Sequence, residues 1–183
     1  MSGAPFLVVP LDAAHDRAGF QCGSDPLDRY LREQATQDVR RRVAACFVAL
    51  AEGPRIAGYY TLASASLMLA DLPANLAGRL PRYPTVPAVR MGRLAVDLVF
   101  RGQGLGGALL ADALDRSVRS EIAAYALMVD AKDEPAAAFY RHHGLIALPD
   151  SPLTLFLPLA TALTSRGTEH KVRRSSTDGD RTY

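Results

Sequence analysis

Four glycines fall within six residues of this chain, at positions 102, 104, 106 and 107. The segment before them, Arg90–Asp97, has the alternation of a β-strand. The segment after them carries apolar residues at helical spacing, namely Leu105, Leu109, Leu110, Leu114 and Val118. The first turn of a helix leaves backbone N–H groups without partners, and the helix dipole favours negative charge there. A strand, a glycine loop and a helix start in this order therefore predict an anion site.

The loop also begins with a cation. Glycines have no Cβ, so an anion can approach the backbone N–H groups closely. Arg101 adds a positive charge at the entrance of the loop, and its guanidinium suits phosphate oxygens. We therefore predict a pyrophosphate site formed by Arg101, Gly102, Gln103, Gly104, Leu105, Gly106 and Gly107.

Two kinds of nucleotide site fit these glycines. Gly102-x-Gly104-x-x-Gly107 matches a dinucleotide fingerprint, and Asp130 could serve as its ribose-binding acid. The same residues read Arg101-x-x-Gly104-x-Gly106, which resembles the coenzyme A loop of the GNAT superfamily of N-acetyltransferases. A dinucleotide fold needs several βα units after its first, yet only about 35 residues with structural patterning follow Asp130. The position of the loop in the chain therefore favours the acetyltransferase.

Tyr140 is a second candidate for chemistry. It lies near the end of a helix predicted over Asp133–His143, which follows a predicted strand at Ala123–Val129. From this spacing its hydroxyl could donate a proton to a bound ligand, or its ring could simply pack beside Phe139. The next two histidines, at 142 and 143, are explained by the dipole at a helix C-terminus. No His, Cys or acidic residues have metal-ligand spacing, so we expect no metal.

Composition indicates one globular domain. The chain has 183 residues, of which 49% are hydrophobic and 22% charged. It contains no apolar run of membrane-spanning length and no signal-peptide pattern, so we expect a cytoplasmic protein without membrane contact. Cys22 and Cys46 are too few for a disulfide framework. The polar, aperiodic segment 165–183 is expected to be a disordered tail, which leaves the domain at 1–164.

The remaining elements predict a sheet with helices on it. Expected strands lie at 6–11, 43–50, 56–69, 90–97, 123–129, 145–148 and 153–159, and expected helices at about 25–39, 71–80, 105–118 and 133–143. Strands outnumber helices and lie mostly early in the chain. We therefore predict an α/β (α+β) fold with a mixed, mostly antiparallel twisted sheet of about six to seven strands flanked by helices, which is the GNAT order.

Five motifs make the resemblance closer, and all lie between about Phe20 and Leu159. Together they resemble the GNAT branch that contains the acetyltransferase toxins of bacterial type II toxin–antitoxin modules, as does the N-terminal Cys22-Gly23 with Leu27-Asp28. The motifs are Gly58-Tyr-Tyr-Thr-Leu62, Gly92-Arg-Leu-Ala-Val-Asp97, Gly102-Gln-Gly-Leu-Gly106, Val129-Asp-Ala-Lys-Asp133 and Phe139-Tyr-Arg-His-His-Gly144.

The resemblance implies an activity, a donor and partners. Members of this branch transfer the acetyl group of acetyl-CoA to the free α-amine of aminoacyl-tRNA, and a DNA-binding antitoxin neutralises them. By this likeness we expect a bacterial cytoplasmic enzyme that needs no metal, a ribbon-helix-helix antitoxin and a homodimer. A GNAT enzyme acting on a small-molecule or protein amine is the alternative. A module that holds coenzyme A or a partner protein without turnover is a third possibility.

The resemblance also implies roles for individual residues. The family places its catalytic acid at Tyr140, and the neighbouring Phe139 is expected to contact the cofactor. Backbone N–H groups of Leu94, Ala95 and Val96 could hold the pantetheine arm and the thioester oxygen, provided that this strand separates from its neighbour. Arg90 and Arg93 lie on the same strand, and their charges must meet water or an anion. They could bind tRNA phosphates, or form salt bridges with Asp97 or Asp71.

Overall fold

The computed structural model describes residues 6–164, which form one seven-stranded sheet of order β1-β2-β3-β4-β5-β7-β6. Neighbouring strands are antiparallel except for β4 and β5, which are parallel. The mixed, mostly antiparallel sheet predicted from the sequence is therefore confirmed. The strands are β1 (Leu7–Pro10), β2 (Ala45–Leu50), β3 (Ile56–Met68), β4 (Thr85–Val96), β5 (Ala126–Asp130), β6 (Ile146–Leu148) and β7 (Ser151–Pro158).

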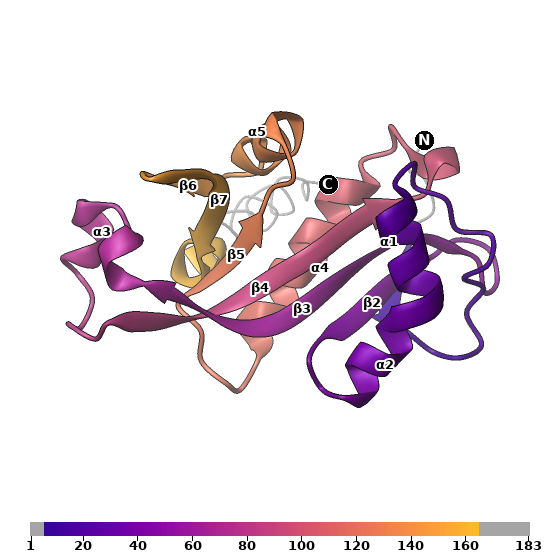
Figure 1. The fold of residues 1–183 in the computed structure, drawn as a ribbon, viewed down its shortest axis with the longest axis horizontal. Helices are drawn as coiled ribbons and strands as arrows, with labels where there is room; N and C mark the ends of the chain where they lie inside the picture. The colour runs from indigo at the N-terminus through magenta and orange to yellow at the C-terminus, as the bar shows by residue number, and fades with distance from the viewer. Residues whose placement is uncertain (1–5, 165–183) are drawn as a thin grey trace, which may run out of the picture.

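Helices cover both faces of this sheet (Figure 1). One face carries α1 (Asp25–Arg29) and α2 (Ala35–Arg40), which are joined by a π-helical turn at Tyr30–Gln34. The other face carries α4 (Leu105–Arg119) and α5 (Glu134–His142). We call these the α1 face and the α4 face. The short elements are the 3₁₀ turns at Leu69–Asp71 and Leu98–Phe100, and α3 at Ala74–Ala77.

The apolar stripe of each helix explains its position. On the α4 face, Leu105, Leu109 and Leu110 pack against buried residues of β3, β4 and β5. On the α1 face, Leu31 and Ala35 pack with residues of β2, β3 and β4. A third buried cluster lies under α3 and includes Val86, Ala88, Met128 and Phe156. The two faces of the sheet are therefore distinct environments for any side chain that points from it.

A β-bulge at Gly92 changes the side-chain direction along β4. Thr61 of β3 pairs with Arg93, whereas the next residue, Leu62, pairs with Met91, so Gly92 is an extra residue in β4. Without this insertion, Arg90 and Arg93 would point to opposite faces because side chains alternate along a strand. With it, both arginines lie on the α1 face.

β4 and β5 separate beyond the bulge. Their parallel pairing runs from Ala88↔Ala126 to Met91↔Val129. In the described part of the chain, the segment Arg93–Val96 of β4 pairs only with β3, on its other side. The separation of strands that the acetyltransferase hypothesis requires is therefore present, and it leaves one backbone edge of β4 unpaired.

Two predicted elements, β4 and the helix at 71–80, differ in extent from the structure. β4 begins at Thr85, five residues before the predicted start, because the long β3 pairs with it as far as Met68↔Thr85. The helix predicted at 71–80 is reduced to α3, with a 3₁₀ turn before it. The tail predicted to be disordered lies outside the described residues. Among the helices described within 6–164, none has the length and apolar character needed to cross a membrane.

Candidate active site

The glycine loop forms a hollow at the N-terminus of α4. Gly104 is the N-cap of this 15-residue helix and has φ 76°, and Gly102 has the same φ. A Cβ on either glycine would meet nothing within 4 Å, so it would project into open space. The hollow has a volume of about 440 Å³ and is lined by Val96, Phe100, Arg101, Gly102, Gly104, Leu105, Gly106, Gly107, Phe139, His142 and His143. A helix N-terminus that opens on such a space fits a pyrophosphate.

The charge of Arg101 is fixed in place by the N-terminal segment. Its guanidinium donates a hydrogen bond to the carbonyl oxygen of Cys22, which is 79 residues earlier in the chain. Gly23 permits this contact, since its φ is 89° and a Cβ there would lie 3.2 Å from the guanidinium. The buried Asp28 carboxylate accepts a bond from the Cys22 N–H at 2.9 Å. The Cys22-Gly23 and Asp28 signature therefore positions the entrance of the loop.

The unpaired edge of β4 presents backbone groups to the gap beside it. The N–H of Asp97 donates to the Ala57 carbonyl at 2.8 Å, which directs the backbone of residue 97 toward β3. Because backbone direction alternates along a strand, Ala95 also faces β3, while Leu94 and Val96 face the gap. Of the three residues predicted to bind pantetheine, Leu94 and Val96 thus have N–H and C=O groups available on that side.

Tyr140 lies on the α4 face, in the buried cluster that includes Met91 of β4 and Val129 of β5. Only 9% of the residue is exposed, and burial raises the pKa of its hydroxyl to about 12. The hydroxyl is therefore protonated throughout the physiological range. It makes no hydrogen bond to any described residue, so an incoming acceptor atom would not have to displace an internal partner. Its ring packs edge-on against Phe139, with 5.2 Å between ring centroids.

His142 and His143 lie at the end of α5, as predicted, and they also line the hollow, together with Phe139. The His143 ring lies 4.7 Å from that of Phe139 and so close to Gly107 that a Cβ there would approach it to 2.8 Å. Spacings of three and four residues place both histidines on the Phe139 side of α5. This spacing from Phe139 indicates that the histidines share its side of the helix, but at the level of sequence the helix dipole alone is sufficient to explain them.

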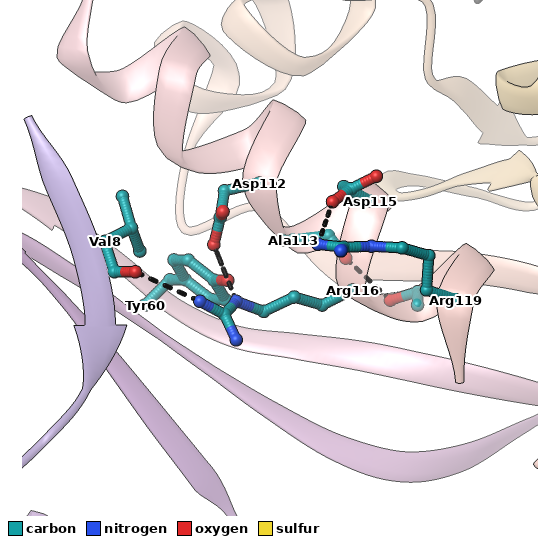
Figure 2. A network of polar contacts seen from close by, with 8 residues as sticks. Val8, Tyr60, Asp112, Ala113, Asp115, Arg116 and Arg119 are labelled. Atoms are coloured by element: carbon teal, nitrogen blue, oxygen red, sulfur yellow. Dashed lines mark hydrogen bonds and ion pairs between the residues drawn. The ribbon is translucent and has the colours of Figure 1, made fainter. Parts of the chain in front are cut away.

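A polar network holds α4 against the sheet. The buried Tyr60 hydroxyl donates to the Asp112 carboxylate, which also accepts from Arg116 at 2.8 Å (Figure 2). Arg116 donates in addition to the Val8 carbonyl of β1 at 3.1 Å. Burial, and then the bond to Asp112, raise the pKa of Tyr60, so it remains a hydrogen-bond donor. Gly58 allows close contact of β3 with α4, since a Cβ there would lie 2.9 Å from Leu109.

Replacing Asp112 with Ala should destabilise the fold. The change leaves the Tyr60 hydroxyl buried without its acceptor, and such a loss typically costs about 1–3 kcal/mol. We expect the free energy of unfolding, measured by urea titration, to fall by that amount. Glu134→Ala is the matched control, because Glu134 pairs with Arg141 in an exposed ion pair, and surface ion pairs contribute about 0–1 kcal/mol. Equal losses in the two variants would contradict the assignment.

The α1 face beside the gap carries the two predicted acceptor-binding arginines. Arg90 forms an ion pair with Asp130 at 3.5 Å, and Asp130 also accepts from the Thr154 hydroxyl. The alternative partners predicted for Arg90, Asp97 and Asp71, are therefore wrong. The Asp97 carboxylate instead accepts backbone N–H bonds from Gln21 and Val99. The ion pair between Arg90 and Asp130 joins two strands that are far apart in the sequence, so it could not be read from the sequence.

Arg93 has a different environment. Its guanidinium carbon lies 3.5 Å from the centroid of the Tyr30 ring, in a cation–π contact. It forms no salt bridge with any carboxylate of residues 6–164. Tyr30 is itself anchored by a hydrogen bond to Asp38 at 2.9 Å. The site thus presents a positioned, half-buried cation without a carboxylate partner near the bulge.

The thiols and acids of the site do not form a metal centre. Within residues 6–164, no three His, Cys, Asp or Glu side chains are placed to hold a metal ion. Cys22 and Cys46 are both buried and unbridged. Burial raises the pKa of Cys22 to about 11 and that of Cys46 to about 12, which leaves both thiols protonated and unreactive. The groups that remain for binding and catalysis are therefore the glycine loop, the unpaired backbone edge of β4, the Tyr140 hydroxyl, and the guanidinium groups of Arg90 and Arg93.

Comparison with known proteins identifies the family. The model of the acetyltransferase (GNAT) family matches residues 12–145. The chain belongs to this family. A tRNA-acetylating toxin of Mycobacterium tuberculosis (strain ATCC 25618 / H37Rv) is 38% identical over 151 residues, which cover 81% of this chain and 89% of the toxin. A probable toxin TacT of Sinorhizobium fredii (strain NBRC 101917 / NGR234) is 31% identical over 166 residues, covering 85% and 92%.

Solved structures agree with this GNAT assignment. AtaT complexed with acetyl-methionyl-tRNAfMet superposes with a TM-score of 0.82 and 28% identity, covering 87% of this chain and 98% of that chain. A mutant AtaT toxin bound to the C-terminus of the antitoxin AtaR and to acetyl-CoA has a TM-score of 0.72 and 26% identity, covering 85% and 94%. The predicted GNAT fold and the resemblance to the acetyltransferase toxins are confirmed.

Proposed function

We propose that this GNAT enzyme transfers the acetyl group of acetyl-CoA to the α-amine of aminoacyl-tRNA, and thereby acts as a toxin in the bacterial cytoplasm. The observation that carries the proposal is the position of Arg93. It is a half-buried cation without a described carboxylate partner, and it lies on the α1 face beside the unpaired edge of β4. A phosphate-rich acceptor would supply its missing anion. The tRNA-acetylating relative from Mycobacterium tuberculosis supports the same acceptor.

The donor side of the proposal uses the loop and the β4 edge. The N-terminal N–H groups of α4, with Arg101 at the entrance, would hold the pyrophosphate of acetyl-CoA. The backbone of Leu94 and Val96 would hold the pantetheine arm beside the gap. Bound there, acetyl-CoA supplies an activated acyl group, and Tyr140 on the α4 face would provide a proton for its thiol leaving group. Because Arg90 and Gly92 are exposed on the α1 face, the acceptor would approach from that side.

The acceptor needs no strong base. An α-amine has a pKa near about 8, so a sizeable fraction is neutral at physiological pH. Attack on a thioester therefore requires mainly that the amine and the carbonyl be held together, which can supply a large part of the rate. Arg93, and Arg90 with its Asp130 partner, would contact the tRNA end and position it.

This acceptor predicts a steep salt dependence. For single-stranded nucleic acid, log affinity falls with log salt by about 0.7 for each phosphate contacted. We expect the apparent affinity for charged tRNA to weaken steeply across a sodium chloride series. Arg93→Ala should weaken binding and reduce the slope by about 0.7 if Arg93 contacts one phosphate. The measurement is the KM for charged tRNA at fixed, saturating acetyl-CoA.

Arg119→Ala provides the control for that series. Arg119 is an exposed cation on α4, across the sheet from Arg93, and it pairs with Asp115. Its removal changes the net charge equally but should leave the slope unchanged. A flat salt response in the wild type, or acetylation of a free amino acid with comparable efficiency, would favour the alternative small-molecule acceptor. Absence of turnover with every amine tested would favour a module that only binds coenzyme A.

The same proposal includes protein partners. We propose that a ribbon-helix-helix antitoxin neutralises the enzyme and that the enzyme forms a homodimer. The AtaT toxin in complex with the C-terminus of its antitoxin AtaR supports an antitoxin partner. The antitoxin class and the dimer follow from the family resemblance. Co-purification with the product of a neighbouring short gene tests the first, and light scattering of the purified enzyme tests the second.

A further inference from the structure

Thr61 is a buried polar residue whose hydroxyl has no partner within residues 6–164. It lies on β3 and is only 2% exposed. Every fully enclosed side-chain oxygen or nitrogen among those residues does have a partner, so the hydroxyl must be the part of Thr61 that still reaches open space. A hydroxyl in a mostly buried residue that faces open space and has no described protein partner is free to bond a ligand, and a ligand that excludes water there must offer it a partner.

The open space next to Thr61 lies over the bulge in β4. Thr61 pairs with Arg93, directly beside the extra residue Gly92. A Cβ on Gly92 would lie 3.2 Å from the Thr61 hydroxyl oxygen. Gly92 is exposed although it lies inside a central strand, so the missing side chain leaves a dip in the sheet surface. The dip opens on the α1 face, between the side chains of Arg90 and Arg93.

The dip also adjoins the place where acetyl transfer would occur. β4 and β5 stop pairing at Met91↔Val129, one residue before Gly92. The unpaired backbone edge of Leu94 and Val96 begins on the other side of the bulge. A group that enters the dip from the α1 face therefore reaches the point where the two strands separate, with Tyr140 on the opposite face.

We propose that the dip over Gly92 is the subsite for the acceptor's primary α-amine, and that the Thr61 hydroxyl positions that amine. The inference rests on the proposed acetyl transfer. The neutral amine donates one N–H to the Thr61 oxygen, which directs its lone pair at the thioester carbonyl carbon. The N–C bond forms as the C=O electron pair moves to oxygen. The electron pair on oxygen then re-forms the C=O bond as the C–S bond breaks. The sulfur leaves with its electron pair and takes the Tyr140 proton, and the nitrogen releases one proton to water, from which Tyr140 is reprotonated.

Thr61→Val tests the proposal because it removes only the hydroxyl. A neutral hydrogen bond of this kind is worth about a tenfold change in rate, so kcat with charged tRNA should fall roughly tenfold. The KM for acetyl-CoA should stay unchanged. The melting temperature should stay the same or rise, since the hydroxyl has no internal partner to lose. Thr61→Ser restores the hydroxyl and should keep kcat within a few-fold of the wild type.

Gly92→Ala tests the dip from its other side. The added Cβ would press on the Thr61 oxygen and fill the space, so kcat should fall while acetyl-CoA binding, measured by calorimetry, is retained. A Thr61→Val enzyme with a kcat within twofold of the wild type would overturn the proposal. A lower melting temperature with unchanged kcat would show that Thr61 only supports the fold. If the wild type does not acetylate charged tRNA, the proposed acceptor fails, and the same variants assayed with methionine ethyl ester still test the amine subsite.

Discussion

Replacing Tyr140 with Phe is expected to lower kcat by about 10²–10⁴-fold, which is the usual contribution of a general acid. The ring and its packing against Phe139 are kept, so the affinity for acetyl-CoA should change little. Stability should also be nearly unchanged, because the hydroxyl has no hydrogen-bond partner among the described residues. Steady-state kinetics with saturating acetyl-CoA measure the effect. A general acid for the leaving group affects kcat and kcat/KM together.

The raised pKa of Tyr140 determines how the proton is used. Burial raises that pKa to about 12, whereas an ordinary thiol titrates near about 8.5. Complete transfer to a free thiolate would therefore be uphill by roughly 5 kcal/mol at 1.36 kcal/mol per pKa unit. The hydroxyl would act mainly as a hydrogen-bond donor to sulfur while negative charge develops, and the proton would move as the C–S bond breaks. Because the donor is lost only as the pH approaches the raised pKa, Tyr140 should produce no alkaline loss of activity between about pH 8 and pH 10.

Tyr125→Phe is the matched control for this change. Tyr125 is a half-buried tyrosine that precedes β5, and burial raises its pKa as well. The same chemical change there should leave kcat within a few-fold of the wild type. Turnover by the Tyr140→Phe enzyme at a comparable rate would make Tyr140 a packing residue, which was the alternative interpretation of its spacing. An alkaline limb near pH 10 that disappears in Tyr140→Phe would contradict the raised pKa.

The parts of the site that the sequence predicted are those fixed by local rules. Positive φ at Gly102 and Gly104, and the helix beginning at Leu105, follow from the spacing of glycines and leucines. The cap of α5 is equally local, since the Asp133 carboxylate accepts from the Ala136 N–H. The turn between β2 and β3 also occurs at the predicted residues. Such features depend on a few consecutive residues, so no knowledge of distant contacts is needed.

The parts that the sequence did not predict depend on pairing between distant strands. Nothing local to Gly92 shows that it is an extra residue opposite Thr61, because a bulge is defined by the partner strand. The bulge alone places Arg90 and Arg93 on one face. On that face Arg90 forms an ion pair with Asp130 of β5, and Arg93 makes a cation–π contact with Tyr30 of the π-helical turn. The acceptor side of the site is therefore a property of strand register.

The second large effect is expected on acetyl-CoA binding, from a substitution in the glycine loop. Gly104→Val should weaken acetyl-CoA binding about 100-fold, because each charge-assisted hydrogen bond lost from the loop is worth about 1.5–3 kcal/mol. A Cβ at Gly104 meets no protein atom within 4 Å, so it would project into the hollow where the pyrophosphate is expected. Calorimetric titration with acetyl-CoA measures the loss. The change also adds strain, since Gly104 has φ 76° and a β-branched residue at positive φ costs about 1–3 kcal/mol.

Gly53→Val is the control that separates the backbone strain from the steric exclusion of the pyrophosphate. Gly53 has φ 63° and open space around its Cβ position, but it lies in the turn between β2 and β3. This control should lose similar stability and keep its affinity for acetyl-CoA. Gly104→Asn keeps the steric exclusion and removes most of the strain, because Asn tolerates positive φ while still carrying a Cβ. If the hollow binds the pyrophosphate, Gly104→Asn loses affinity at nearly wild-type stability. If it retains affinity, the phosphate lies elsewhere and Gly104 serves only the conformation of the turn.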